Sequence, residues 1–124
     1  MELCEPLSFG DLVTGWHSTG IPNIAMFVHS GDPFQGDLSQ LPGPNAQQRE
    51  AHRARAVAEV TGADGTVSRS VIETVNGYTY TPIAAVEAAR RVLSCERRQG
   101  FQTPAKLLGV GFAEHIAGTA VTDY

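Results

Sequence analysis

The pattern that most constrains the fold of this chain is a hairpin signature near its middle. Two runs, Arg53–Thr61 and Thr66–Val75, flank the sequence GADG, whose Asp64-Gly65 dipeptide suits a turn with positive φ. In the first run small residues share one face, which indicates close approach of a helix: Ala54, Ala56, Ala58 and Val60. In the second run three valines share one face: Val67, Val71 and Val75. The sequence therefore predicts two antiparallel strands, with one packed face and one that meets water or a neighbouring subunit.

A helix is predicted directly after this hairpin. Thr81 can cap the first free N–H groups, and Pro82 suits the first helical position because an N–H there would be unpaired anyway. Apolar residues recur at helical spacing and are predicted to face the core: Ile83, Val86, Ala89 and Leu93. The intervening charged residues are predicted to point away from it: Glu87, Arg90 and Arg91. Gly100 is predicted to end this helix.

The N-terminal half carries shorter patterns. Asp11–His17 and Asn23–His29 are interpreted as the strands of a second antiparallel hairpin, joined by Ser18–Pro22. The three prolines and three glycines of Gly31–Pro44 predict a loop. The polar run from Asn45 begins either a short helix or the approach to a strand.

The C-terminal part repeats the threonine–proline capping signal. Thr103-Pro104 predicts one or two helical turns over Ala105–Leu108, which end before Gly109. Phe112–Ile116 is interpreted as a last short strand. Hairpins followed by helices predict an α+β fold, with a mostly antiparallel sheet of about five strands and helices packed on one face.

Length, charge and cysteine content restrict the class of protein. With 124 residues, the chain is predicted to form a single domain over residues 1–124, and its net charge of -4 argues against nucleic-acid binding. No apolar run approaches the ~20 residues of a membrane-spanning helix, and the first residues lack a secretory signal pattern. Cys4 and Cys95 indicate no disulfide framework, and no Cys–His spacing supports a metal site. A cytoplasmic location is therefore predicted.

The candidate binding residues gather in the sequence WHSTGIPNI. Gly20 permits unusual backbone dihedrals and Pro22 fixes its own φ, so the neighbouring polar groups would stand on a stiffened turn. Four candidate substrate-binding residues stand on this turn: His17, Ser18, Thr19 and Asn23. A fifth candidate, Gln102, lies outside it, just before the predicted cap at Thr103. Their alternative role is structural, because polar turn residues commonly satisfy their own backbone. The chain has no GxGxxG or GxSxG motif and no complete catalytic set, so no catalytic residue and no bound cofactor is assigned to it.

The order of several motifs resembles a known family. WHSTGIPNI is followed by a Gly/Pro-rich loop, the hairpin that turns at GADG, NGYTYTPIAAVEAARRVL and GFQTPAKLLG. From about Asp11 to Ile116 this order is similar to the C-terminal half of saccharopine-dehydrogenase-like NAD(P) oxidoreductases, of the trans-acting enoyl reductase type. The most specific parts are STGIPN (Ser18–Asn23) and GFQTP (Gly100–Pro104).

The resemblance implies a role as one domain of a larger enzyme. In that family an N-terminal Rossmann domain binds NAD(P), and a second α+β domain covers the nucleotide, shapes the substrate pocket and often supports dimerisation. This chain matches only the second domain, which implies a substrate-side and dimerisation domain that is inactive alone. His17, Ser18, Thr19 and Asn23 would then border the substrate side of the cleft. Two other hypotheses stay open: a stand-alone small-ligand-binding module, and a dimerisation domain whose exposed sheet face pairs with its copy.

Overall fold

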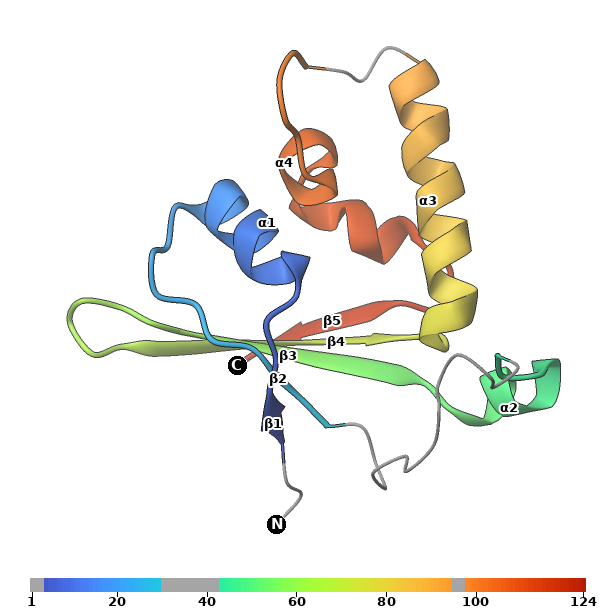
Figure 1. The fold of residues 1–124 in the computed structure, drawn as a ribbon, viewed down its shortest axis with the longest axis horizontal. Coiled ribbons are helices and arrows are strands. Elements are labelled where there is room, and N and C mark those ends of the chain that lie inside the picture. Colours follow the sequence, from blue (N-terminus) through green and yellow to red (C-terminus); the bar gives the residue numbers. More distant parts are fainter. Residues whose placement is uncertain (1–3, 30–42, 95–97) are drawn as a thin grey trace.

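A computed structural model describes residues 4–29, 43–94 and 98–124 (Figure 1). Its elements are, in order, β1 (Glu5–Pro6), α1 (Gly10–Thr19), β2 (Phe27–Val28), α2 (Ala46–Ala51), β3 (Ala54–Thr61), β4 (Val67–Thr74), α3 (Gly77–Leu93), α4 (Pro104–Leu108), the 3-10 helix η2 (Val110–His115) and β5 (Ala120–Asp123). The fold is α+β. Most of the predicted loop Gly31–Pro44 lies outside the described residues.

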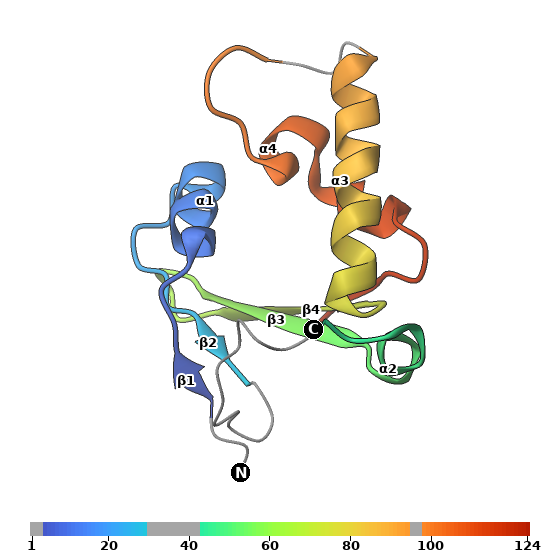
Figure 2. The same cartoon turned by 45° about the vertical axis from the view of Figure 1, so that its right-hand side comes forward.

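The described strands form two separate antiparallel sheets. β3, β4 and β5 make a three-stranded sheet in that order, and β1 pairs with β2. Both views place α1, α3 and α4 on the same side of the three-stranded sheet (Figures 1 and 2). The single sheet of about five strands is therefore not found in this part of the chain, because the N-terminal pair stays apart.

The central hairpin is confirmed. β3 and β4 pair without interruption from Ala54↔Thr74 to Thr61↔Val67, and Gly65 at the tip has a φ of 85°. The Asp64 carboxylate accepts hydrogen bonds from the Thr66 N–H and hydroxyl at 2.9 and 2.8 Å, and these bonds lower the pKa of Asp64. The sequence could predict this turn because its stabilising contacts are local.

The predicted strand Asp11–His17 is wrong, because these residues belong to the helix α1. Leu12, Val13 and Trp16 fit helical spacing as well as a strand, and β propensity alone is a weak guide. Gly20, with a φ of 75°, ends the helix by donating its N–H to the Trp16 carbonyl at 2.7 Å. WHSTGIPNI is thus the last turn of a helix and its exit, so the predicted N-terminal hairpin does not form.

The second predicted N-terminal strand, Asn23–His29, is much shorter in the structure. Only Phe27–Val28 is extended and paired, and its partner is Glu5–Pro6 from a lead-in that showed no period. The helix α1 stands between these two short strands in the chain. Alternation in sequence could not reveal this partner, because each strand has just two residues.

The helix α3 begins earlier than the Thr81-Pro82 signal predicts. Asn76 is its N-cap and accepts a hydrogen bond from the Tyr78 N–H at 3.0 Å, so Pro82 lies inside the helix. The helix ends at Leu93 rather than near Gly100. Pro82, in the second turn, has no N–H and therefore removes one backbone hydrogen bond of the helix. The helix nevertheless continues to Leu93.

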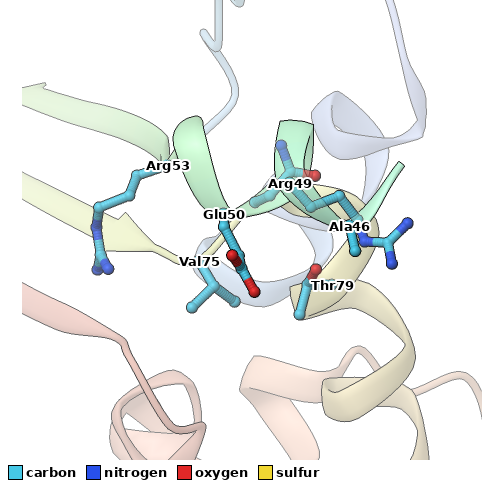
Figure 3. A pocket seen from close by; sticks show the side chains of 7 residues that line it. Ala46, Arg49, Glu50, Arg53, Val75 and Thr79 are labelled. Carbon is cyan, nitrogen blue, oxygen red and sulfur yellow. The ribbon is translucent and has the colours of Figure 1, made fainter. Parts of the chain in front are cut away.

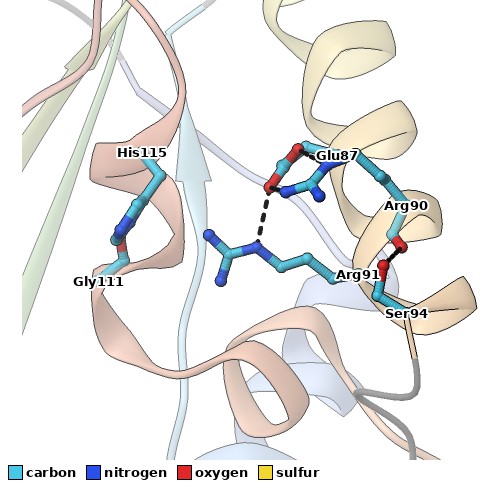
Figure 4. Close-up of polar contacts among 6 residues, drawn as sticks. All are labelled: Glu87, Arg90, Arg91, Ser94, Gly111 and His115. Atoms are coloured by element: carbon cyan, nitrogen blue, oxygen red, sulfur yellow. Dashed lines mark hydrogen bonds and ion pairs between the residues drawn. The ribbon is translucent and has the colours of Figure 1, made fainter.

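The apolar stripe of α3 faces solvent, opposite to its predicted direction. Val86 is 69% exposed and Leu93 is 84% exposed. Glu87 and Arg91 instead lie on the side of α3 that meets η2 (Figure 4). The Arg91 guanidinium stacks over the Phe112 ring at 5.3 Å and bonds Glu87 at 2.9 Å. An ion pair and a cation–π contact therefore take the place that the apolar stripe was predicted to fill.

This arrangement predicts an acid-sensitive contribution to stability. Hydrogen bonds from Arg90 and Arg91 lower the pKa of Glu87 from 4.5 to about 2. A lowered folded-state pKa stabilises the fold fully above pH ~4.5, and that stabilisation disappears as the pH falls toward 2. We expect Glu87→Gln to flatten the dependence of unfolding free energy on pH between 2 and 4.5, measured by urea denaturation. The variant Arg90→Gln/Arg91→Gln should lose the same slope, and an unchanged slope in both would contradict the assignment.

The C-terminal segment is also rearranged. Phe112–Ile116, predicted as a strand, lies instead in the 3-10 helix η2 and its exit, while the last strand is Ala120–Asp123. Thr103 caps α4 as predicted, by accepting the Lys106 N–H at 3.2 Å. Among the described residues, three hydrophobic side chains are buried: Val71, Phe112 and Ile116. The small core thus lies between β4 and η2.

Candidate functional site

The two most specific motifs of the sequence meet in the structure. His17 Nε2 lies 3.1 Å from the Phe101 carbonyl oxygen, and Ser18 Oγ lies 2.6 Å from Thr103 Oγ1. These contacts join the last turn of α1 to the start of α4 across more than 80 positions of sequence. We call this contact between α1 and α4 the motif junction.

The hydroxyl groups of the junction form a chain with one direction. Ser18 Oγ lies 2.7 Å from the Thr14 carbonyl, which can only accept, so Ser18 donates to it. Thr103 Oγ1 accepts from the Lys106 N–H, and its own proton is therefore directed to Ser18. Because Thr103 is 4% exposed, this proton has no competing water at hand. The motif junction thus holds the C-terminal end of α1 against the N-terminal end of α4.

An aromatic cluster borders the motif junction. The His17 ring centre lies 4.8 Å from that of Phe101 and 6.4 Å from that of Trp16. Since the Phe101 carbonyl can only accept, His17 donates from Nε2. Trp16 and Phe101 are both more than half exposed. The cluster therefore presents two aromatic rings beside the imidazole at the molecular surface.

The other candidate residues have separate surroundings. Thr19 donates to the Gly15 carbonyl at 2.8 Å and accepts from the Ile21 N–H, so it finishes α1. Asn23 is exposed beyond the helix end. Gln102 donates to the Gln99 carbonyl at 3.1 Å, while its Oε1 is enclosed and has no donor among the described residues. The structure thus places His17 and Ser18 in contact with Phe101 and Thr103, the two neighbours of Gln102. Thr19 and Asn23 take no part in the motif junction.

Sequence reasoning missed Phe101 and assigned Thr103 only a capping role. Both stand in GFQTP, on either side of the candidate residue Gln102. The aromatic residue beside a candidate polar residue was the signal that could have found Phe101. The partner of Thr103 could not be found in this way, because Ser18 comes from a distant segment that was interpreted as a turn.

Replacing the serine of the motif junction is expected to lower the stability of the fold. Ser18→Ala leaves the buried Thr103 hydroxyl without its acceptor, which should cost about 1–3 kcal/mol of unfolding free energy. Thr19→Ala, one position along, removes only exposed bonds within α1 and should cost less than about 1 kcal/mol. Urea denaturation of both variants measures the difference, and equal losses would contradict the directed chain.

A hollow lies elsewhere, beside the N-terminus of α3. It has a volume of about 390 Å³, and it is lined by residues of α2, by Arg53 after that helix, and by the residues around the start of α3 (Figure 3). Its two arginines are held by backbone carbonyls: Arg49 by Pro44 and Arg53 by Gly118, each at 2.6 Å. Glu50 and Val75 also line the hollow (Figure 3). With charges of both signs and arginines already engaged, this hollow selects no class of ligand.

Two classes of site find no support in the described ranges. Their His, Cys, Asp and Glu side chains form no group of three placed to hold a metal ion. Their helices include none that is long and apolar enough to cross a membrane.

Comparisons of this chain with protein-family models, with curated proteins and with solved structures find no match.

Proposed function

We propose that this chain is the substrate-side and oligomerisation domain of a saccharopine-dehydrogenase-like NAD(P)-dependent oxidoreductase of the cytoplasm, inactive on its own. In this proposal a Rossmann domain of the parent protein binds NAD(P), and the present chain covers the nucleotide. His17, Asn23 and Gln102 then border the small-molecule substrate, while Ser18 and Thr19 hold the backbone that carries them.

The observation that carries this proposal is the set of large apolar side chains that the described residues leave exposed. Three hydrophobic side chains are buried in this part of the chain, whereas Val13 and Trp16 on α1 and Val86 and Leu93 on α3 are each more than half exposed. Such faces are expected in a domain that another body completes.

The motif junction adds independent support. The resemblance rests most on STGIPN and GFQTP, which share no pattern that requires them to touch. The contact between Ser18 and Thr103 brings the two motifs together, and His17, just before the first motif, contacts Phe101 of the second. A shared substrate cleft would require such proximity. The enclosed Gln102 Oε1 beside them is an acceptor that has no donor among the described residues.

The test uses the native polypeptide that contains this chain, purified from its source. We expect its mass to show further domains of about 100–200 residues each. NADH or NADPH titration should quench intrinsic fluorescence saturably. Hydrogen exchange should be slower in the α1 and α3 peptides of the native polypeptide than in those of the isolated chain, because the covering domain suppresses local opening.

Two results would overturn the proposal. One is a native polypeptide that binds neither nucleotide. The other is equal exchange of the α1 and α3 peptides in both forms, since the exposed faces would then have no covering domain. The peptide that spans β4 serves as the internal control, because its Val71 is already buried within this chain.

A further inference from the structure

Among the described residues, the outer edge of β3 lies unpaired at the side of the three-stranded sheet. β3 pairs with β4 on one side, and no described strand pairs with its other side. All of its residues from Arg55 to Thr61 are exposed, with Val57 at 56%. Proteins commonly protect such an edge with proline or a bulge, yet β3 contains no proline and pairs without interruption.

The alternation of hydrogen-bonded pairs along the hairpin shows which backbone groups face the outer edge of β3. The Gly62 N–H donates to the Thr66 carbonyl at 2.7 Å, and on the far side of β4, Arg69 and Tyr124 exchange two hydrogen bonds. Bonded pairs alternate along antiparallel strands. Residues 54, 56, 58 and 60 therefore bond to β4, while residues 55, 57, 59 and 61 direct their N–H and C=O groups outward.

The side chains of the outward-directed residues are self-complementary. Arg55 and Glu59 lie two positions to either side of Val57, on the same face of β3. Each already has an opposite charge beside it on β4: Arg55 Nε lies 3.8 Å from Glu73 Oε1, and Glu59 Oε2 lies 3.1 Å from Arg69 Nε. A second β3, antiparallel and centred on Val57, would place Arg55 of each copy opposite Glu59 of the other.

We propose that β3 pairs antiparallel with β3 of a second copy of this chain, about a two-fold axis at Val57. The pairing makes about six backbone hydrogen bonds over Arg55, Val57 and Glu59. It also aligns two rows of four charges. Each row runs from Glu73 and Arg55 of one copy to Glu59 and Arg69 of the other, so that acidic and basic side chains alternate. A register shifted by two residues would place Arg55 opposite Val57 or Thr61 and lose these rows.

The charges therefore favour a second copy over an unrelated strand, because an antiparallel β3 of the same sequence supplies the opposite charge at both positions. The inference rests on the oligomerisation part of the proposed function and specifies its partner. It does not depend on nucleotide binding.

Charge-reversal variants of the native polypeptide test partner and register together. In Arg55→Glu all four facing positions are acidic, and in Glu59→Arg all four are basic. Sedimentation should show each variant alone with a dimer Kd raised at least about tenfold, because like charges oppose each other across the strands. An equimolar mixture should restore the dimer, since each acidic position then faces a basic one. Dimers of either variant at wild-type affinity, or no recovery in the mixture, would overturn the pairing.

Arg90→Glu is the matched control. It makes the same change of charge and breaks an exposed ion pair with Glu87, but Arg90 stands on α3 and belongs to neither row. We expect its dimer Kd to stay within about threefold of wild type, as is usual for exposed pairs. A tenfold rise would overturn the proposal, because the effect of Arg55→Glu could then not be ascribed to the edge.

Cysteine cross-linking measures the register directly. Val57→Cys places two thiols at the two-fold axis, where paired Cα atoms about 5.5 Å apart allow a disulfide. Val60→Cys, at a similarly exposed valine three positions along, would place its thiol about 20 Å from its copy. Oxidation should yield a disulfide between the two residue-57 peptides, identified by mass, and none between residue-60 peptides. Cross-linking at both positions, or at neither, would overturn the register.

The results also separate the two proposals. A native polypeptide that binds NAD(P) but sediments as a monomer at about 100 μM, well above ordinary protein–protein dissociation constants, overturns the β3 pairing alone. A dimer that cross-links at residue 57 without binding either nucleotide supports the pairing and overturns the oxidoreductase assignment.

Discussion

Gly118→Ala is expected to destabilise the fold by about 2–4 kcal/mol, from two effects at one position. Gly118 has a φ of 78°, where a side chain strains the backbone. A Cβ added there would lie 2.7 Å from Val75 Cγ1, well inside van der Waals contact. Relief of this clash would shift the Gly118 carbonyl, which accepts a hydrogen bond from Arg53 at 2.6 Å. Urea denaturation, with the midpoint and slope both fitted, measures the change.

Two further variants separate backbone strain from the clash. Gly65→Ala has the same sign of φ, 85°, with open space around the added Cβ, so it should cost only about 1–2 kcal/mol. In a Val75→Ala background the clash is absent, and the cost of Gly118→Ala should fall toward that of Gly65→Ala. If Gly118→Ala and Gly65→Ala cost the same in the wild-type background, the close approach of Gly118 to Val75 is wrong.

Ile116→Ala is expected to lower the unfolding free energy by about 2–5 kcal/mol, because it opens a cavity in a small core. Ile116 is 2% exposed, and its burial is shared with only Val71 and Phe112 among the hydrophobic residues of the described ranges. A core this small has few neighbours that can move in to fill the space. For a chain with a total stability of about 5–15 kcal/mol, the loss is a large fraction of the whole.

Val110→Ala is the matched control for this prediction. Val110 starts the same 3-10 helix that ends before Ile116, but it is 99% exposed. Its truncation should change the unfolding free energy by no more than about 0.5 kcal/mol. A large loss at Val110 would show that another body or a second copy covers it in solution, and equal losses at both positions would contradict the assignment of the core.

Elements stabilised by contacts between near neighbours could be predicted from the sequence. The hairpin turn at Asp64-Gly65, the cap of α4 at Thr103 and the short helix after Asn45 were predicted in their places, the last as one of two alternatives. Asn45 and Gln48 form a reciprocal capping box, in which each side chain bonds the backbone of the other. Such signals lie within three or four residues, so they read directly from the chain.

The candidate site was only partly predictable. His17 and Ser18 were named because their side chains carry donors and acceptors near Gly20 and Pro22, and Gln102 because it stands just before the cap at Thr103. Their geometry was not foreseen, since WHSTGIPNI was interpreted as a turn between strands and is the end of a helix. The partner of Ser18 is Thr103, 85 positions away, and no local pattern specifies such a contact.

By itself, the sequence determined the α+β class, the central antiparallel hairpin and the capped helix start at Thr103. Tertiary structure decided which elements meet and which faces they bury. It paired the last strand with β4, turned the apolar stripe of α3 to solvent, and packed Arg91 over Phe112. The physical reason is one of range, because turns and caps are chosen by contacts between neighbours. The side of a helix that becomes buried depends on the surfaces available to cover it, which no local pattern specifies.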